Sequence, residues 1–407
     1  MNKKIIFYLL GWIMNMEAIF MLLPCVVAAI YRESSGIWFL AVMAVCGTTG
    51  LLLTRRKPDN MVFFAKEGFV SVALSWIVLS FFGSLPFYLS REIPRFEDAM
   101  FEVISGFTTT GASILPDVES LSHCMLIWRS FTHWIGGMGV LVFILAVLPL
   151  AGGYNMYLMK AESPGPSVGK LVPKVKSTAK ILYGIYFFMT VVEILLLLAG
   201  GMPLFDSLAT GFGTAGTGGF GIKNSSIAYY DSYYLQGVIT VFMILFGINF
   251  NVYYLFLVHH PKDALRCEEA RVYLGIIGVT VLLITLNIRG SFTSLFAAFH
   301  HAAFQVASII TTTGFSTVDF DKWPEFSKGL LVVLMFIGAC AGSTGGGVKV
   351  SRLVVLVKTV RKELIQFLHP QVIRKIKMDG KVVEHEVVRS INVFMVAYTL
   401  LFSLSVF

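Results

Sequence analysis

The stretch "SGFTTTGAS", residues 105–113, is small, polar and centred on glycine, yet it lies between two long apolar runs. A related stretch, "IITTTGFST", recurs at residues 309–317. Backbone that leaves a helix at membrane depth is tolerated only where it is buried in protein or lines a water-filled cavity. If the flanking runs cross a membrane, the two stretches predict a repeated polar turn inside an apolar protein.

The composition of the whole chain indicates a membrane protein. Of 407 residues, 56% are hydrophobic and 14% are charged, whereas soluble domains average about 25% charged residues. The N-terminal apolar run is too long for a signal peptide, so we expect it to be retained as a first span. The cysteines show no paired metal spacing and are interpreted as structural thiols: Cys25, Cys46, Cys124, Cys267 and Cys340.

A spanning helix needs about 20 mostly apolar residues. The runs that satisfy this length are 5–30, 37–53, 66–89, 125–149, 178–200, 233–258, 271–288, 327–368 (long and interrupted) and 387–407. Lys and Arg gather in alternate connections between them and at Lys3 and Lys4. The positive-inside rule therefore predicts a cytoplasmic N-terminus. The net charge of +8 comes without a basic stripe for nucleic acid.

The opposite side of the membrane is expected to carry most of the carboxylates. These are Glu92, Glu97, Asp98, Glu102, Asp117 and Glu119, against Arg91, Arg95 and Arg129. An acidic outer mouth would concentrate cations. The alternative is that each carboxylate belongs to an ordinary solvated loop.

Three outer connections follow one pattern, at 94–117, 202–224 and 291–319. Each holds an amphipathic segment of about three turns, too short to span, and then a Thr/Gly turn. The anchoring glycines are Gly111, Gly218 and Gly314. Three copies of helix, half-helix, turn and helix constitute an internal repeat.

The repeated turn suits a monovalent cation. Glycine allows successive carbonyls to point one way, and rings of such carbonyls can replace the hydration shell of potassium. The half-helices would aim their negative C-terminal ends at the same cavity. Two other motifs are excluded by context: "GFGTAG" at 211–216 lacks a βαβ unit, and "GSTGGGVK" at 342–349 departs from the phosphate-loop spacing.

Glycines also cluster inside the run 327–368, at Gly338, Gly342, Gly345, Gly346 and Gly347. Clustered glycine weakens a helix, so we predict a broken helix, with close helix packing as the alternative. Gly136, Gly137 and Gly139 are interpreted as packing glycines and His133 as a packed core residue. Glu17 and Glu193 are intramembrane ionisable candidates without a motif.

These stretches together resemble the Trk/Ktr/HKT potassium transporter family, within it the TrkH branch. The matching segments are "ISGFTTTGAS", "WRSFTHWIGGMGVLVFILAVLP", "GTGGFG", "TTTGFST" and "GACAGSTGGGVKVSRL", from about residue 60 to the end. The resemblance implies an all-α polytopic fold of helix–pore loop–helix units around a pseudo-fourfold pore. The expected ranges are 1–58 for two extra N-terminal helices, 59–160, 161–265 and 266–370 for three pore units, and 371–407 for the start of a fourth.

The resemblance also implies the site. Potassium would bind in a filter made of Thr109, Thr110, Gly111, Gly216, Thr217, Gly218, Thr312, Thr313 and Gly314. The gate would be Gly342, Ser343, Thr344, Gly345, Gly346 and Gly347. Glycine rather than serine at Gly111 implies potassium selectivity. No organic cofactor and no enzymatic activity are expected.

The expected function is potassium uptake across the bacterial inner membrane, driven by the membrane potential, with channel-like flux and proton-coupled flux as the two alternatives. The expected partners are a second copy of the chain and a cytosolic, TrkA-like ring of nucleotide-binding subunits. The repeat spacing places a fourth turn near position 414, so we expect the sequence to be C-terminally incomplete. The alternative function is a sodium- or proton-dependent symporter of a small organic solute.

Overall fold

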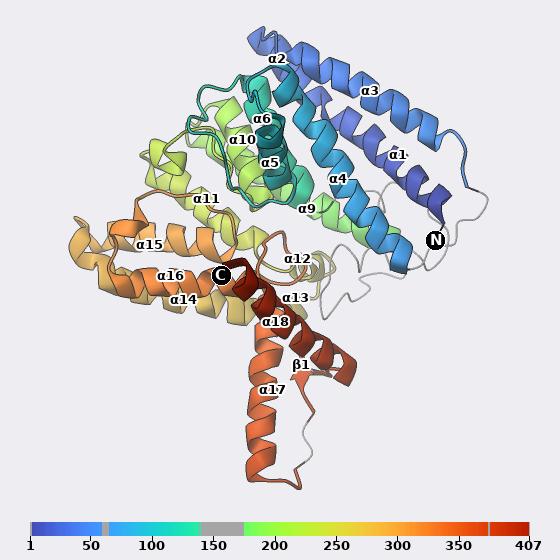
Figure 1. Ribbon diagram of the computed structural model, residues 1–407. Helices are drawn as coiled ribbons and strands as arrows, with labels where there is room; N and C mark the ends of the chain where they lie inside the picture. Colours follow the sequence, from blue (N-terminus) through green and yellow to red (C-terminus); the bar gives the residue numbers. More distant parts are fainter. Residues whose placement is uncertain (1, 59–64, 138, 140–174, 373–374, 407) are drawn as a thin grey trace.

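Long apolar helices form the frame of the protein, whose computed structural model describes residues 2–58, 65–137, 139, 175–372 and 375–406 (Figure 1). Six helical segments in these ranges are long and apolar enough to cross a membrane: Lys3–Tyr31, Gly36–Thr54, Lys66–Leu89, Lys180–Ala199, Glu268–Ser291 and His385–Val406. The prediction of an all-α polytopic membrane protein is confirmed.

The N-terminal part of the described chain contains six helices. Its helices are α1 (Lys3–Phe20), α2 (Leu22–Tyr31), α3 (Gly36–Thr54), α4 (Ala65–Leu89), α5 (Phe96–Phe107) and α6 (His123–Gly137). α1 packs against both α3 and α4. The buried indole of Trp128 on α6 donates to the Gly83 carbonyl on α4 at 3.0 Å. The second half of the predicted span 125–149 lies outside the described residues.

The middle part of the described chain consists of α9 (Val175–Ala199), α10 (Leu204–Ala215), the 3-10 helix η1 (Ser226–Tyr229), α11 (Tyr233–Phe246) and α12 (Phe250–Leu257). The prediction of one continuous span over 233–258 is wrong, because α11 and α12 meet at 89°. Asn249 starts the new helix, since its side chain accepts a hydrogen bond from the Asn251 N–H at 2.9 Å. Asn is a favoured residue at this capping position.

The C-terminal part of the described chain begins at Pro261. The elements are α13 (Pro261–Arg266), α14 (Glu268–Ile288), η2 (Arg289–Ser291), α15 (Leu295–Ile310), η3 (Phe320–Lys322), α16 (Glu325–Ile337), α17 (Val350–Leu368), β1 (Lys377–Met378), β2 (Lys381–Val382) and α18 (His385–Val406). β1 and β2 pair as a short antiparallel hairpin. The predicted break within 327–368 is confirmed at residues 338–349, and α17 projects away from the body (Figure 1).

Three short helices, α5, α10 and α15, lie between the long ones. They contain 12, 12 and 16 residues, and 12 residues of helix reach only about 18 Å. Their starts suit the helix dipole: acidic residues occupy the first turns of α5 and α10. At α15, the Ser294 hydroxyl accepts from the Ala297 N–H at 3.0 Å. Each of these helices is therefore shorter than the about 20 residues that a membrane span needs.

Candidate functional site

The three half-helices end in the same hydrogen-bonded turn. After α5, the Thr109 N–H donates to the Gly106 carbonyl at 3.1 Å, and the Thr110 N–H donates to the Ser105 carbonyl at 2.9 Å. This pair of bonds is the Schellman arrangement that closes many helices. It recurs after α10 and α15, donated by Thr217 and Gly218 and by Thr312 and Thr313.

The residue that closes each turn is a threonine in the left-handed region. The φ angles are +54° at Thr109, +52° at Thr217 and +60° at Thr312. Glycine is usual at this position, and a residue with a side chain costs roughly 1–2 kcal/mol there. Such strain concentrates at ligand-binding sites. Its recurrence at three equivalent positions marks the turns as the candidate site.

The repeated backbone pattern includes a glycine that the sequence prediction omitted. Two residues after each threonine lies a glycine with positive φ: Gly111, Gly219 and Gly314. The second turn thus runs over 217–219, one residue later than the predicted Gly216, Thr217 and Gly218. The signal was present in the sequence, because "TTGA" at 109–112, "TGGF" at 217–220 and "TTGF" at 312–315 align on their last glycine.

The three turns meet backbone to backbone. A β-carbon added to Gly111 would lie 1.9 Å from the Gly218 carbonyl oxygen. A β-carbon on Gly219 would lie 1.7 Å from the Thr313 carbonyl oxygen. The second turn therefore adjoins both the first and the third, and only glycine permits these approaches.

The carbonyl groups of the turns are available as ligands. Within the described ranges, no hydrogen bond ends on the main-chain oxygens of 109–111, 217–219 or 312–314. The hydroxyls, in contrast, bond locally: Thr217 Oγ1 donates to the Gly216 carbonyl at 2.7 Å, and Thr312 Oγ1 donates to the Thr311 carbonyl at 2.6 Å. The hydroxyls at these two positions thus fix the turn, and the carbonyls offer the site its partial negative charge.

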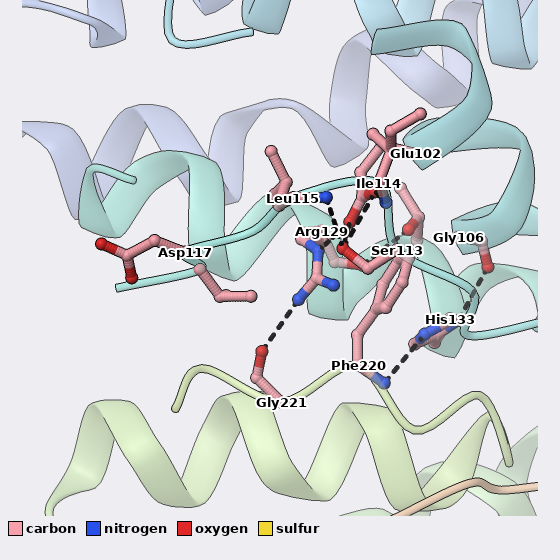
Figure 2. A network of polar contacts seen from close by, with 12 residues as sticks. Glu102, Gly106, Ser113, Ile114, Leu115, Asp117, Arg129, His133, Phe220 and Gly221 are labelled. Carbon is pink, nitrogen blue, oxygen red and sulfur yellow. Dashed lines mark hydrogen bonds and ion pairs between the residues drawn. The ribbon is translucent and has the colours of Figure 1, made fainter. Parts of the chain in front are cut away.

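A buried ion pair braces the first turn against the second (Figure 2). The Arg129 Nε donates to a carboxylate oxygen of Glu102, and the Arg129 Nη1 donates to the Gly221 carbonyl at 2.8 Å. The Glu102 carboxylate also accepts from the Ser113 hydroxyl and the Ile114 N–H, both at 3.1 Å. The guanidinium lies 3.6 Å from the centre of the Phe220 ring.

His133 on α6 supplies a second link between the same two turns. Its Nδ1 lies 2.8 Å from the Gly106 carbonyl oxygen, and its Nε2 accepts from the Phe220 N–H at 3.2 Å. These partners require a neutral imidazole with the proton on Nδ1. The prediction of a packed core histidine describes its burial but misses this connection.

The non-helical segment 338–349 lies against the third turn. The Gly346 N–H donates to Thr312 Oγ1 at 2.7 Å, and a β-carbon on Gly345 would lie 3.0 Å from the Thr311 carbonyl oxygen. Positive φ angles at Gly338, Gly342 and Gly347 bend the segment back on itself. The predicted gate residues 342–347 are therefore brought next to predicted filter residues.

The bend between α11 and α12 forms the seat of this segment. The Cys340 N–H donates to the Gly247 carbonyl at 3.0 Å, and the Phe250 N–H donates to the Gly342 carbonyl at 3.0 Å. The Thr344 hydroxyl donates to the Phe246 carbonyl at 3.2 Å. Two interrupted helices therefore satisfy one another's main-chain groups, as interrupted helices inside a membrane must.

Four ionisable residues that the sequence singled out are buried. Glu102 and Arg129 form the ion pair between the first two turns, and the other two are Glu17 and Glu193. Glu102 and Arg129 were expected in an outer loop, but they are 1% and 3% exposed and paired. Glu17 and Glu193 are also buried, and Glu17 lies at the contact between α1 and α4, where its Oε1 would be 3.3 Å from a β-carbon on Gly83. Among the described residues, no three His, Cys, Asp or Glu side chains gather as metal ligands.

Membrane-spanning helices alternate with half-helices, whose turns bring together carbonyls that accept no hydrogen bond within the described residues. This arrangement defines a membrane transport protein with re-entrant loops. A family model described as "TrkH: Cation transport protein" matches residues 36–407. The chain belongs to the TrkH family and is a multi-pass inner-membrane transport protein, not an enzyme. The match begins within α3, earlier than the motifs indicated.

Curated relatives and a solved structure agree with this assignment. The Trk system potassium uptake protein TrkH of Salmonella typhimurium is 37% identical over 394 residues, which cover 95% of this chain and 81% of that protein. The TrkH protein of Vibrio parahaemolyticus is 35% identical over 413 residues, covering 99% and 84%. The crystal structure of the potassium transporter TrkH from Vibrio parahaemolyticus matches with a TM-score of 0.89 at 33% identity, covering 99% of this chain and 85% of that one.

Proposed function

We propose that this protein carries potassium ions through a pore lined by the main-chain carbonyls of 109–111, 217–219 and 312–314. The observation that carries the proposal is the convergence of three strained Thr-x-Gly turns whose carbonyls accept no hydrogen bond within the described residues. Carbonyl rings of this kind replace the hydration shell of potassium. The potassium uptake proteins among the relatives support this choice of ion.

The driving force in this proposal is the membrane potential, worth about 2.3 kcal/mol per elementary charge and 100 mV. Potassium is the cargo, and no organic cofactor takes part. The segment 342–347 is the gate, because its backbone is hydrogen-bonded to the third turn. The pore units run over 59–160, 161–265 and 266–370, with the extra helix pair at 1–58 and a fourth unit starting at 371–407.

The proposal extends to orientation and partners. The distribution of Lys and Arg supports a cytoplasmic N-terminus. A homodimer and a cytosolic ring of nucleotide-binding subunits are the proposed assembly, since the named relatives are components of a Trk system. The basic inner connections and the projecting α17 offer the surface for that ring.

Growth of a potassium-uptake-deficient bacterium tests the proposal. The full-length gene is expected to restore growth at low potassium, and Gly111→Ser is expected to lose this rescue, because its β-carbon would lie 1.9 Å from the Gly218 carbonyl oxygen. Gly275→Ser is the matched control, because a β-carbon on Gly275 meets nothing within 4 Å. A well-expressed protein that fails to rescue, or that rescues only with an organic solute, would overturn the proposal.

A further inference from the structure

We propose that Glu269 is the positioning residue that holds the segment 338–349 closed against the third turn. The proposal rests on the proposed role of this segment as the gate. It assigns a function to a buried carboxylate that lies outside both the turns and the Gly-rich segment.

One carboxylate oxygen of Glu269 ties together two distant points of the segment. Its Oε1 accepts from the Ala341 N–H at 2.6 Å and from the Ser351 N–H at 2.9 Å. Ala341 lies inside the segment, whereas Ser351 lies in the first turn of α17. Glu269 itself belongs to the start of α14 and is 2% exposed. The carboxylate therefore clips the segment and the helix that follows it to a different helix.

The surroundings favour a charged clip. Hydrogen bonds that end on a carboxylate are stronger than neutral ones. Two cations close to the clip bond back to the same segment: the Lys349 Nζ donates to the Gly345 carbonyl, and the Arg352 Nη1 donates to the Val348 carbonyl at 2.8 Å. The segment is thus fixed from the α14 side by Glu269, from within by its own Lys349, and from α17 by Arg352.

The clip is linked directly to the short hairpin after α17. The neighbouring Glu268 pairs with Lys358 of α17, and its N–H donates to Asp379 Oδ1 in the turn between β1 and β2 at 2.6 Å. A movement of the hairpin or of the α14 start would therefore carry Glu269 with it. Withdrawal of the Glu269 oxygen would release Ala341 and Ser351 together.

Potassium flux into proteoliposomes, measured on the purified full-length protein without any partner, tests the clip. Glu269→Ala removes both hydrogen bonds and is expected to raise this flux about a hundredfold, because the loss of each bond to a charged group is worth about tenfold. Glu269→Gln keeps an acceptor oxygen but loses the charge, so its flux is expected to lie between that of the wild type and that of Glu269→Ala. Glu269→Asp withdraws the oxygen by one methylene and is expected to leak. Glu363→Ala is the matched control, because it removes the ion pair of Glu363 with Lys362 on α17 but neither bond to the segment.

The reactivity of Cys340 gives a second readout that a general loss of stability would not mimic. Cys340 lies within the segment and is 0% exposed. In a background where the other four cysteines are serine, a small maleimide is expected to label Cys340 faster in Glu269→Asp than in Glu269→Gln. This pair remains decisive if Glu269→Ala does not fold.

The outcomes separate the two proposals. If the wild type carries potassium and both Glu269→Ala and Glu269→Asp show the same flux as the wild type, the role of Glu269 is overturned and the proposed function stands. A well-folded wild type that carries no potassium in liposomes or in cells would overturn the proposed function, and the clip with it.

Discussion

Gly346 and Thr312 are joined by a 2.7 Å hydrogen bond in which the glycine N–H donates to the threonine hydroxyl. The bond connects the interrupted helix of the third unit to a strained turn of the candidate filter. Thr312 Oγ1 also donates to the Thr311 carbonyl, so a single hydroxyl serves both the turn and the segment.

The two roles of this hydroxyl can be separated by comparing the loss of the Thr312 hydroxyl with the loss of the Thr217 hydroxyl. Thr312→Val keeps the shape of the side chain and is expected to raise potassium flux without a partner about fivefold, because one neutral hydrogen bond contributes about 1 kcal/mol. Thr217→Val is the control, since it loses the equivalent local bond to Gly216 but makes no hydrogen bond to the segment within the described residues. Equal flux from the two variants would contradict the role of the Gly346 contact.

The register of the second turn can be tested at Gly219. Gly219→Ala is expected to abolish potassium transport, because its β-carbon would lie 1.7 Å from the Thr313 carbonyl oxygen and the φ of +78° disfavours a side chain. Gly221→Ala is the matched control, with its nearest neighbour at 3.5 Å. Growth at limiting potassium and the amount of protein in the membrane are the measurements. Normal transport by Gly219→Ala would contradict the close contact between Gly219 and the Thr313 carbonyl oxygen.

The brace in Figure 2 is expected to control selectivity. Arg129→Lys keeps the charge but shortens the reach to Gly221, and the preference for potassium over sodium is expected to fall about tenfold through the loss of one charge-assisted hydrogen bond. Competitive flux measurements with the two ions check this. An unchanged preference would limit Arg129 to a structural role.

Stability and selectivity can be separated at the same pair. Glu102→Leu leaves a buried guanidinium unpaired and is expected to lower the free energy of unfolding by about 3–5 kcal/mol. The double variant Glu102→Leu with Arg129→Leu is expected to recover much of that loss, because apolar side chains can replace a buried pair. Its thermal stability should return while its selectivity stays low. Recovery of both properties would argue against the brace.

The contacts of Glu33 with the start of α6 are expected to be acid-sensitive. Burial alone would raise the pKa of Glu33, but hydrogen bonds from the Cys124 and His123 N–H groups and from the His123 side chain together lower it below its ordinary value. A depressed folded-state pKa gives stability that is present above the unfolded-state pKa and lost as pH falls through the folded-state value.

The measurement is the melting temperature of the detergent-solubilised protein as a function of pH. The advantage of wild type over Glu33→Gln should be full near neutrality and should shrink on the acid side of carboxyl titration. An advantage that grows as the pH falls would contradict the assignment.

The sequence predicted the helical frame and the three turns because both depend on local patterns. Apolar run length gave the spans, and the repeated Thr-Gly stretches gave the site. The 89° bend after Phe246 was missed because its cause is not local: the main-chain groups freed there are satisfied by the segment near Cys340 and Thr344, about 95 residues later.

Long-range partners also explain the other differences. Glu102 and Arg129 carry charge, so each alone suggests a solvated loop. Only the fold brings Glu102 on α5 to Arg129 on α6 and both to the Gly221 carbonyl. The one-residue shift in the second turn is different in kind, because the alignment of "TGGF" with "TTGF" was readable without a structure.

The bend between α11 and α12 contacts one particular segment of the chain, 338–349. At the bend, the Phe246 carbonyl accepts a hydrogen bond from Thr344, and the Gly247 carbonyl accepts one from the Cys340 N–H. A ring of identical copies would have to put the same bend and the same glycine-rich segment at every position, although each bend serves only the segment beside it. Exchanging one turn-bearing part of the chain for another would therefore leave a main-chain donor or acceptor without its counterpart.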